Sequence, residues 1–181
     1  EAKTGRIVAA TQRPNFNAND KPVAPKLWAN LLDQNPFEPG STMKGITLAA
    51  AIETGKWRPE DTYQSGTLLI DGKKVVDAFG QDQGMLTYRE GFWRSSNVAF
   101  ARVEQQLGPT VWRNYLEKFR FLQSTNSGLN GEQAGIMSFT YPIDQANTAY
   151  GQGISVTPLQ MIQAYSAIAN NGQEEIGRAH V

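Results

Sequence analysis

Residues 38–44, which read Glu-Pro-Gly-Ser-Thr-Met-Lys (EPGSTMK), carry a serine and a lysine three positions apart, directly before an apolar stretch. The proline and glycine break the chain, and residues 41–54 then carry apolar side chains almost all round, which predicts a buried helix. Gly55 supplies a C-terminal stop for that helix. Because positions i and i+3 of a helix share one face, Ser41 and Lys44 are predicted to lie within reach of each other.

This pair of side chains suggests nucleophilic chemistry. A serine hydroxyl is a poor nucleophile at neutral pH and needs an adjacent base. Lys44 can act as that base only if burial or another cation lowers its pKa, and the apolar helix offers burial. The tetrapeptide alone is weak evidence, since on the order of one chance match is expected in a chain of this length. A helix-capping Ser41 with a solvated Lys44 is the simpler interpretation of these residues by themselves.

A second polar motif, Ser-Ser-Asn at residues 95–97, precedes a predicted helix over residues 98–107. Its first hydroxyl can pass a proton between Lys44 and a leaving amine, while its amide can donate to a substrate carbonyl and anchor the lysine. Capping of the following helix is the alternative interpretation. Residues 124–126 (Ser-Thr-Asn) also fit Ser-x-Asn, but they lie in a polar stretch that no apolar helix follows.

The composition excludes several other classes of site. The chain has no cysteine, so disulfides, thiolate nucleophiles and cysteine-bound zinc are excluded. The single histidine is His180, which argues against a Ser-His-Asp mechanism and a histidine-bound metal. The 17 basic and 17 acidic side chains balance, so nothing indicates a nucleic-acid surface. We expect no metal and no organic cofactor.

The rest of the chain predicts short elements separated by turn residues. Asp71-Gly72 favours a type I′ hairpin, and the capping box at residues 157–160, with proline at the first helical position, begins a helix that ends at Asn171-Gly172. That helix is predicted to pack one face formed by Leu159, Ile162, Tyr165 and Ile168. The other expected elements are a strand at 6–11, a short helix at 27–32, hairpin strands at 67–70 and 74–77, helices at 87–93, 98–107 and 110–119, and a long, partly irregular connection at 123–147.

The order and spacing of these motifs resemble the class B penicillin-binding proteins, above all the division-type members of Gram-positive bacteria. The resemblance rests on residues 38–44, on residues 95–97 and, most specifically, on residues 150–161 (YGQGISVTPLQM). Residues 3–9 (KTGRIVA) also look like the first hairpin of that family's catalytic domain. The likeness covers nearly the whole chain up to Gly172.

The resemblance implies an α+β fold of the serine penicillin-binding and β-lactamase type. It also implies a membrane-anchored D,D-transpeptidase whose catalytic domain faces outside the membrane. Such an enzyme attacks the D-Ala-D-Ala end of a peptidoglycan stem peptide, forms an acyl-enzyme and passes the acyl group to a neighbouring amine. β-Lactam antibiotics acylate the same serine. The implied partners are stem peptides, β-lactams and the division or elongation machinery.

The family motifs also assign roles to individual residues. Ser41 would be the nucleophile and supply half of the oxyanion hole through its N–H, with Lys44 as its base. Ser95 would relay a proton, and Asn97 would anchor the substrate and the lysine. Candidate substrate contacts, each with packing as the alternative, are Tyr150, Phe79 and Trp93.

One family motif, a Lys-Ser/Thr-Gly triplet on a later sheet strand, has no counterpart downstream. Residues 3–5 (Lys-Thr-Gly) match the letters but precede the nucleophile, so we interpret them as part of a turn. We therefore expect residues 1–174 to be the amino-terminal portion of the transpeptidase domain, with the helical subdomain present and most central-sheet strands missing. Residues 175–181 can be written in codons that spell a widely used sequencing adapter, and we expect them to be read-through. We expect this stretch alone to be unstable and inactive.

Two other functions use related chemistry. A β-lactamase or D,D-carboxypeptidase would pass the acyl group to water, which requires a carboxylate placed over the acyl bond, and Glu132 is the only acidic residue between Asn126 and Tyr141. A β-lactam sensor domain would be acylated without catalysing a further step. The lifetime of the acyl-enzyme and the presence of a signalling domain distinguish these possibilities.

Overall fold

The computed structural model describes residues 1–15, 17, 19, 24, 28–78 and 82–173. The chain divides into two compact units. One unit comprises Glu1–Phe37, Phe119–Ile136 and Val156–Val181, and the other comprises Glu38–Lys118 and Met137–Ser155. All four predicted catalytic residues belong to the second unit.

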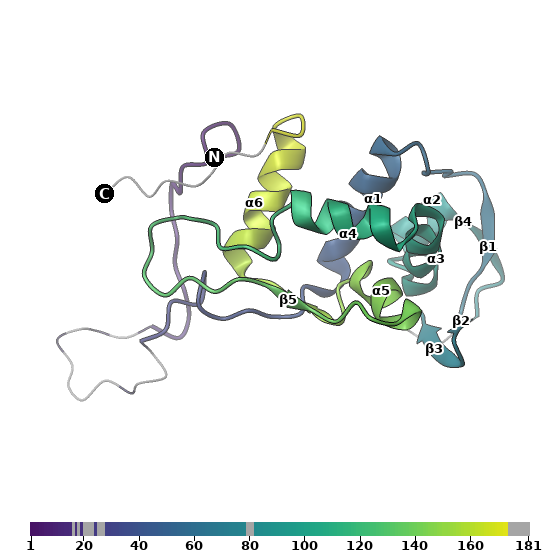
Figure 1. Cartoon of the computed structure of the whole chain (residues 1–181), viewed down its shortest axis with the longest axis horizontal. Helices are drawn as coiled ribbons and strands as arrows, with labels where there is room; N and C mark the ends of the chain where they lie inside the picture. The colour runs from purple at the N-terminus through teal and green to yellow at the C-terminus, as the bar shows by residue number, and fades with distance from the viewer. Residues whose placement is uncertain (16, 18, 20–23, 25–27, 79–81, 174–181) are drawn as a thin grey trace. The chain divides into compact units, whose positions relative to one another are not determined.

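The described residues form helices joined by short strands (Figure 1). The elements in chain order are the 3₁₀ helix η2 (Gly40–Thr42), α1 (Met43–Glu53), β1 (Thr62–Gln64), β2 (Thr67–Ile70), β3 (Lys73–Val76), β4 (Met85–Thr87), α2 (Tyr88–Trp93), α3 (Asn97–Leu107), α4 (Pro109–Lys118), β5 (Ile136–Met137), α5 (Pro142–Thr148), β6 (Ile154–Ser155) and α6 (Pro158–Ala169). This helix-rich α+β architecture with few strands agrees with the expected fold class.

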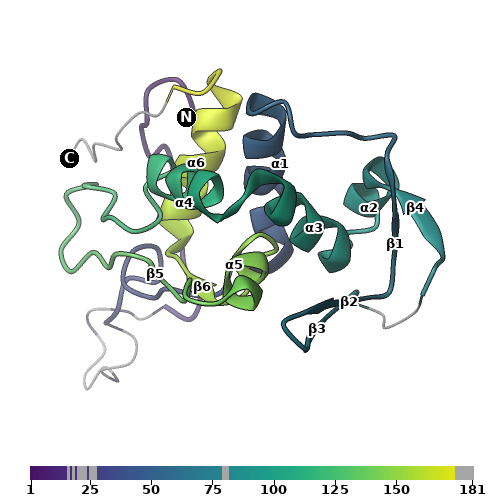
Figure 2. The same ribbon diagram turned by 45° about the vertical axis from the view of Figure 1, so that its right-hand side comes forward.

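Helix α3 is the centre of the second unit. It contacts α1, α2, α4, α5 and β3 (Figure 2). Phe100 on α3, Met43 on α1 and Trp112 on α4 are fully buried, and the Trp112 indole N–H donates to Thr148 Oγ1 of α5 at 2.8 Å. Burial of side chains this large is the main stabilising contribution that a helical core can make.

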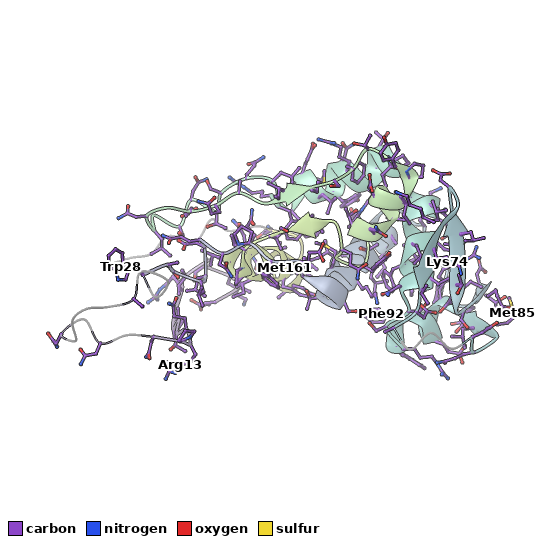
Figure 3. The ribbon with its side chains drawn as sticks, turned by 90° about the horizontal axis from the view of Figure 1, so that it is seen from below. Arg13, Trp28, Lys74, Met85, Phe92 and Met161 are labelled. Carbon is purple, nitrogen blue, oxygen red and sulfur yellow. The ribbon has the colours of Figure 1, made fainter. Side chains whose placement is uncertain are left out.

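The strands form three two-stranded pairs among the described residues: β1 with β4, β2 with β3, and β5 with β6. The β2–β3 pair is the predicted hairpin, with Ile70 opposite Lys73. Asp71 and Gly72 between them have φ angles of 48° and 76°, as a type I′ turn requires. Met85 on β4 lies at the outer edge of this unit (Figure 3) and is exposed.

Helix α6 of the first unit begins at the predicted capping box, in which Thr157 and Gln160 exchange hydrogen bonds. Gln160 is fully buried, and its Nε2 also donates to the carbonyl oxygens of Phe121 at 2.9 Å and Gln123 at 2.6 Å. Buried polar groups are stable only when they are hydrogen-bonded in this way. One side chain therefore caps α6 and holds a neighbouring loop.

The predicted packing face of α6 was wrong. Ile162 is 60% exposed, and Tyr165 and Ile168 are also exposed, whereas the buried side of the helix carries Gln160, Met161, Gln163, Ala164 and Ala167. Two faces of α6 carry residues at helical spacing. The face that carries the alanines is the buried one, because small side chains let the helix pack more closely against its neighbours. Leu159, Ile162 and Tyr165 instead help to line an open hollow of about 770 Å³ together with residues 5–11.

Two other predictions for local structure were also wrong. Residues 6–11 form no strand, because no described segment pairs with them. Within residues 27–32, of which 27 is not described, the chain makes a turn closed by the Gln34 N–H to the Asn30 carbonyl at 2.9 Å. The connection at 123–147 is partly irregular, as expected, but helix α5 occupies its end, and the start of this helix is marked by Pro142 in its first turn.

Glu104 on α3 gives a prediction for the stability of the second unit. Its side chain is 3% exposed, Oε1 has no hydrogen-bond partner among the described residues, and burial raises the pKa of Glu104 to about 7. Because the folded state favours the protonated acid, stability is lost as the pH rises from the unfolded pKa through about 7. We expect Glu104→Gln to stabilise the protein by about 1–2 kcal/mol at pH 8 and to have little effect at pH 4, measured by urea unfolding.

The matched control is Glu53→Gln on α1, where the side chain is exposed. It should change the free energy of unfolding by less than about 0.5 kcal/mol at either pH. Equal effects of the two variants at pH 8 would contradict the assignment of a buried, unpaired carboxyl to Glu104.

Candidate active site

The candidate nucleophile lies at the start of α1, an apolar helix of the second unit. Ser41 is in η2, the turn that leads directly into α1, and its side chain is exposed. Lys44 is in the first turn of α1 and is 2% exposed. The Lys44 Nζ to Ser41 Oγ distance is 3.1 Å. The predicted i, i+3 contact is therefore present, and the solvated lysine of the simpler interpretation is not.

Residues 95–97 supply the other partners of the Lys44 ammonium group. Nζ lies 2.9 Å from Ser95 Oγ and 2.9 Å from Asn97 Oδ1, and it also contacts the Ser95 carbonyl oxygen. Ser95 Oγ in turn lies 2.9 Å from Ser41 Oγ. The two serine hydroxyls and the lysine nitrogen thus form a closed triangle through which a proton can be exchanged.

The Lys44 nitrogen has four oxygen neighbours, Ser41 Oγ, Ser95 Oγ, the Ser95 carbonyl and Asn97 Oδ1. A charged ammonium has only three protons to donate. A neutral amine has two protons and a lone pair, so the Ser41 hydroxyl can donate to it. Neither form can pair with all four oxygens at once, and the neutral form is the one that can accept the serine proton.

Burial increases the fraction of Lys44 in that neutral form, although the ammonium form still predominates at pH 7. Burial lowers the pKa of Lys44 to about 8, while the negative charge of Asp77 acts in the opposite direction. With a pKa of about 8, roughly one lysine in ten is neutral at pH 7. A base with a pKa close to the working pH combines adequate population with adequate basicity.

The helix-capping role in the second motif belongs to its middle residue. Ser96 is the N-cap of α3, and its Oγ accepts the Ala99 N–H at 3.0 Å. Ser95 and Asn97 are therefore free to face Lys44. The capping interpretation is confirmed for Ser96, and the catalytic interpretation of Ser95 and Asn97 stays a prediction.

The Gly-Gln-Gly segment packs directly against the turn that carries Ser41. The Gly40 N–H donates to the Gly151 carbonyl at 2.9 Å, and the Gly153 N–H donates to Glu38 Oε1 at 2.8 Å. Gly151 has φ +83°, and a Cβ added to it would lie 2.1 Å from the Gly40 carbonyl oxygen. Only glycine fits at this position, because both the conformation and the space exclude a side chain.

The three weaker candidates for substrate contacts have different surroundings. Tyr150 is 5% exposed, donates its hydroxyl to Asn147 Oδ1, and has its pKa raised to about 12 by burial. Trp93, the last residue of α2, is 73% exposed. Phe79 lies outside the described residues. Contact of any of the three with a substrate stays a prediction.

The two coincidental motifs lie in local structures of the first unit. Lys3 and Thr4 are part of a turn in which the Gly5 N–H donates to the Glu1 carbonyl at 3.0 Å. In the loop that contains residues 124–126, Glu132 accepts hydrogen bonds from the Thr125 hydroxyl, the Asn126 N–H and the Ser127 hydroxyl. The Glu132 carboxylate is therefore held by hydrogen bonds within its own loop.

Sequence reasoning missed two residues that organise the site, Asp77 and Gly151. Asp77 accepts hydrogen bonds from the Ser96 hydroxyl and the Val98 N–H. The only local signal for Asp77 is an acidic residue at the end of the predicted hairpin strand 74–77. Gly151 belongs to the motif at residues 150–161, but its close approach to Gly40 depends on the fold.

The described part of the chain contains neither a metal-binding cluster nor a helix that could span a membrane. No group of three or more His, Cys, Asp or Glu side chains there could hold a metal ion. Likewise, none of the helices found there has both the length and the apolarity needed to cross a bilayer.

Comparison with known proteins identifies the class to which this fold and site belong. The model of the penicillin binding protein transpeptidase domain matches residues 1–175. The chain belongs to this family. It is 37% identical over 177 residues to the stage V sporulation protein D of Bacillus subtilis, covering 94% of this chain and 27% of that protein.

Other relatives extend the likeness. The chain is 36% identical to penicillin-binding protein PbpB of Mycolicibacterium smegmatis, over 95% of this chain and 28% of that protein. It is 28% identical to the peptidoglycan D,D-transpeptidase FtsI of Escherichia coli K12, over 95% of this chain and 30% of that protein. The crystal structure of penicillin binding protein 2X from Streptococcus thermophilus superposes with a TM-score of 0.88 at 38% identity, over 98% of this chain and 27% of that one. The chain spans between a quarter and a third of the length of these relatives.

Proposed function

We propose that this chain carries the acylation site of a peptidoglycan D,D-transpeptidase that cross-links cell-wall stem peptides and is a target of β-lactams. The observation that supports this most is the closed contact of Ser41, Lys44 and Ser95, with Asn97 as a further partner of the buried lysine. A helix cap and a surface lysine would not require this arrangement. Relatives whose names state peptidoglycan D,D-transpeptidase activity support the same reaction.

The proposed reaction begins with loss of the Ser41 proton to neutral Lys44, either directly or through Ser95. Ser41 Oγ then attacks the carbonyl carbon of the D-Ala-D-Ala amide, and the Ser41 N–H stabilises the developing oxyanion. As the C–N bond breaks, the proton passes through Ser95 to the departing amine, which leaves as D-alanine. An ester between Ser41 and the stem peptide remains.

The second half of the reaction reverses these roles. The amine of a neighbouring stem peptide attacks the ester carbonyl and gives up a proton through the same network. A new amide bond forms, and Ser41 regains its hydroxyl hydrogen. Atoms and charge balance without a metal or an organic cofactor. Asn97 is assigned to hydrogen-bond both the donor peptide and Lys44, which keeps the two groups aligned.

The cellular setting follows from the same family membership. We propose that the complete protein is anchored in the cell membrane with its catalytic domain outside. We also propose that it works with the division or elongation machinery. The stage V sporulation and FtsI names of the relatives favour a role linked to division or differentiation.

The test is covalent labelling of the complete protein encoded by the source gene. A fluorescent penicillin is expected to acylate it with one label per chain, and mass spectrometry should find the whole β-lactam added to the peptide that contains Ser41. Ser41→Ala should abolish labelling. Ser124→Ala, the same change in the competing Ser-x-Asn sequence, should leave it unaltered. Labelling that persists in Ser41→Ala would overturn the proposal.

The fate of the acyl-enzyme separates the related functions. Release of the label within seconds would indicate a β-lactamase. A long-lived acyl-enzyme, together with incorporation of a free D-amino acid in place of the terminal D-Ala of a pentapeptide, is the expected outcome. A long-lived acyl-enzyme without any such exchange would indicate a sensor domain.

A further inference from the structure

We propose that Asp77 is a positioning residue that holds Ser95 and Asn97 against Lys44. This inference rests on the acyl transfer proposed above. Asp77 follows the last residue of β3 and touches none of the reacting groups, so its action on the reaction passes through other residues.

The carboxylate of Asp77 joins the hairpin to the start of α3. Oδ1 accepts the Ser96 hydroxyl at 2.8 Å and the Val98 N–H at 3.0 Å. Oδ2 accepts the Gly66 N–H at 3.0 Å, and the Asp77 N–H donates to the Gly66 carbonyl at 3.1 Å. An ionised carboxylate that accepts three hydrogen bonds is a firm anchor, because each bond to a charged acceptor is stronger than a neutral one.

The residue before Asp77 orients the catalytic amide. Asn97 Nδ2 donates to the Val76 carbonyl at 2.9 Å, which turns Asn97 Oδ1 toward Lys44 Nζ. Two consecutive residues at the end of the hairpin therefore hold the three consecutive residues 96–98. This attachment is specific to the segment that carries the second motif.

Ser95 needs such support because of its backbone. Its φ is +56°, in the left-handed region that residues with a side chain seldom adopt. A strained conformation persists only where its surroundings fix it from several sides. The Ser95 N–H donates to the Phe92 carbonyl at 3.0 Å and the Ser96 N–H to the Gly91 carbonyl at 2.8 Å, which fixes the preceding side. Asp77 fixes the following side.

Asp77 also acts on Lys44 by its charge. The groups that face Lys44 are Ser41 from η2, Ser95 from the turn before α3 and Asn97 from α3, and all three are uncharged. Asp77 is the titratable group whose charge acts on the lysine, and it favours the ammonium form. A change at residue 77 should therefore alter both the rate of acylation and its dependence on pH.

The experiment measures the acylation rate constant with a fluorescent penicillin, from pH 6 to pH 10, in the complete protein. In the wild type the rate should rise with pH, because neutral Lys44 is the base. Asp77→Asn removes the negative charge but keeps an acceptor for Ser96 and Val98, so the midpoint should move to lower pH by about half a unit or more. Asp77→Ala removes the anchor, and the rate at the high-pH plateau should fall by about 10- to 100-fold.

The matched control is Asp71→Asn in the turn of the same hairpin. The Asp71 side chain makes no hydrogen bond or ion pair among the described residues, and asparagine tolerates its φ of 48°. This control should match the wild type in rate and midpoint. Circular dichroism identifies any variant that does not fold. If Asp77→Ala does not fold, Asp77→Asn alone still tests the proposal.

The outcomes separate this inference from the function on which it rests. If the wild type is acylated at Ser41 and both Asp77 variants match Asp71→Asn in plateau and midpoint, the role of Asp77 is refuted and the proposed function stands. If the wild type is not acylated at Ser41, both proposals fall. A purely structural role would lower the amount of folded protein without moving the pH midpoint, and that result would also refute the inference.

Discussion

Lys44→Arg is expected to lower the rate of Ser41 acylation by about 10³-fold, as much as Lys44→Ala does. Arginine keeps the positive charge and the capacity to donate hydrogen bonds, but it cannot lose a proton near neutral pH. A general base contributes about 10²- to 10⁴-fold to a reaction, so removing only the ability to accept a proton should cost nearly the full effect. The measurement is the acylation rate constant with a fluorescent penicillin at pH 8.

The pH dependence supplies an independent check on the same residue. Because burial lowers the pKa of Lys44 to about 8, the wild-type rate should increase about tenfold per pH unit well below pH 8 and level off above it. Lys74→Ala is the control, because Lys74 lies on the exposed side of β3 (Figure 3). If Lys44→Arg stayed within tenfold of the wild type, Lys44 would serve to hold charge, and another group would be the base.

Gly151→Ala is expected to reduce acylation by about 100-fold. A methyl group at this position would lie 2.1 Å from the Gly40 carbonyl oxygen, so Gly40 and the neighbouring Ser41 must move. A displacement of about 1 Å at a reacting group can cost two orders of magnitude in rate. The rate constant for acylation and the melting temperature should be measured together, since the same substitution also strains a residue with φ +83°.

Gly153→Ala is a matched control for this variant. Gly153 also has a positive φ of 67°, but a Cβ there would meet only the Asn147 Cβ at 3.8 Å. Both variants carry a comparable backbone penalty of about 1–2 kcal/mol, and only Gly151→Ala carries the collision. Equal losses of acylation in the two variants would show that backbone strain, and not contact with Gly40, limits the reaction.

Much of the second unit could be predicted because its signals are local. Three such signals are the type I′ turn at Asp71-Gly72, Thr87, whose side chain accepts the Glu90 N–H at the start of α2, and Gly108, which directly follows α3. Each fixes a boundary by backbone chemistry that depends on a few neighbouring residues. The Ser41–Lys44 contact was predictable for the same reason, since helix geometry sets the i, i+3 distance.

The wrong predictions concern features that depend on contacts between segments far apart in the sequence. Residues 6–11 have the composition of a strand, but a strand exists only with a hydrogen-bonding partner. Ala164 and Ala167 bury one face of α6 because small side chains allow close packing, which a pattern of large apolar residues does not reveal. Asp77 and Gly151 lie far along the chain from the residues that they hold, and no local pattern marks such contacts.

The Ser96 hydroxyl both donates and accepts a hydrogen bond, which limits the residue types that can stand between Ser95 and Asn97. Its oxygen accepts the Ala99 N–H while its hydrogen goes to Asp77, so the position requires a short side chain that both accepts and donates. Threonine and asparagine meet both demands. Alanine meets neither, and aspartate would place a second negative charge against Asp77. In this protein, therefore, only a few residue types can occupy the middle position of the Ser-x-Asn motif.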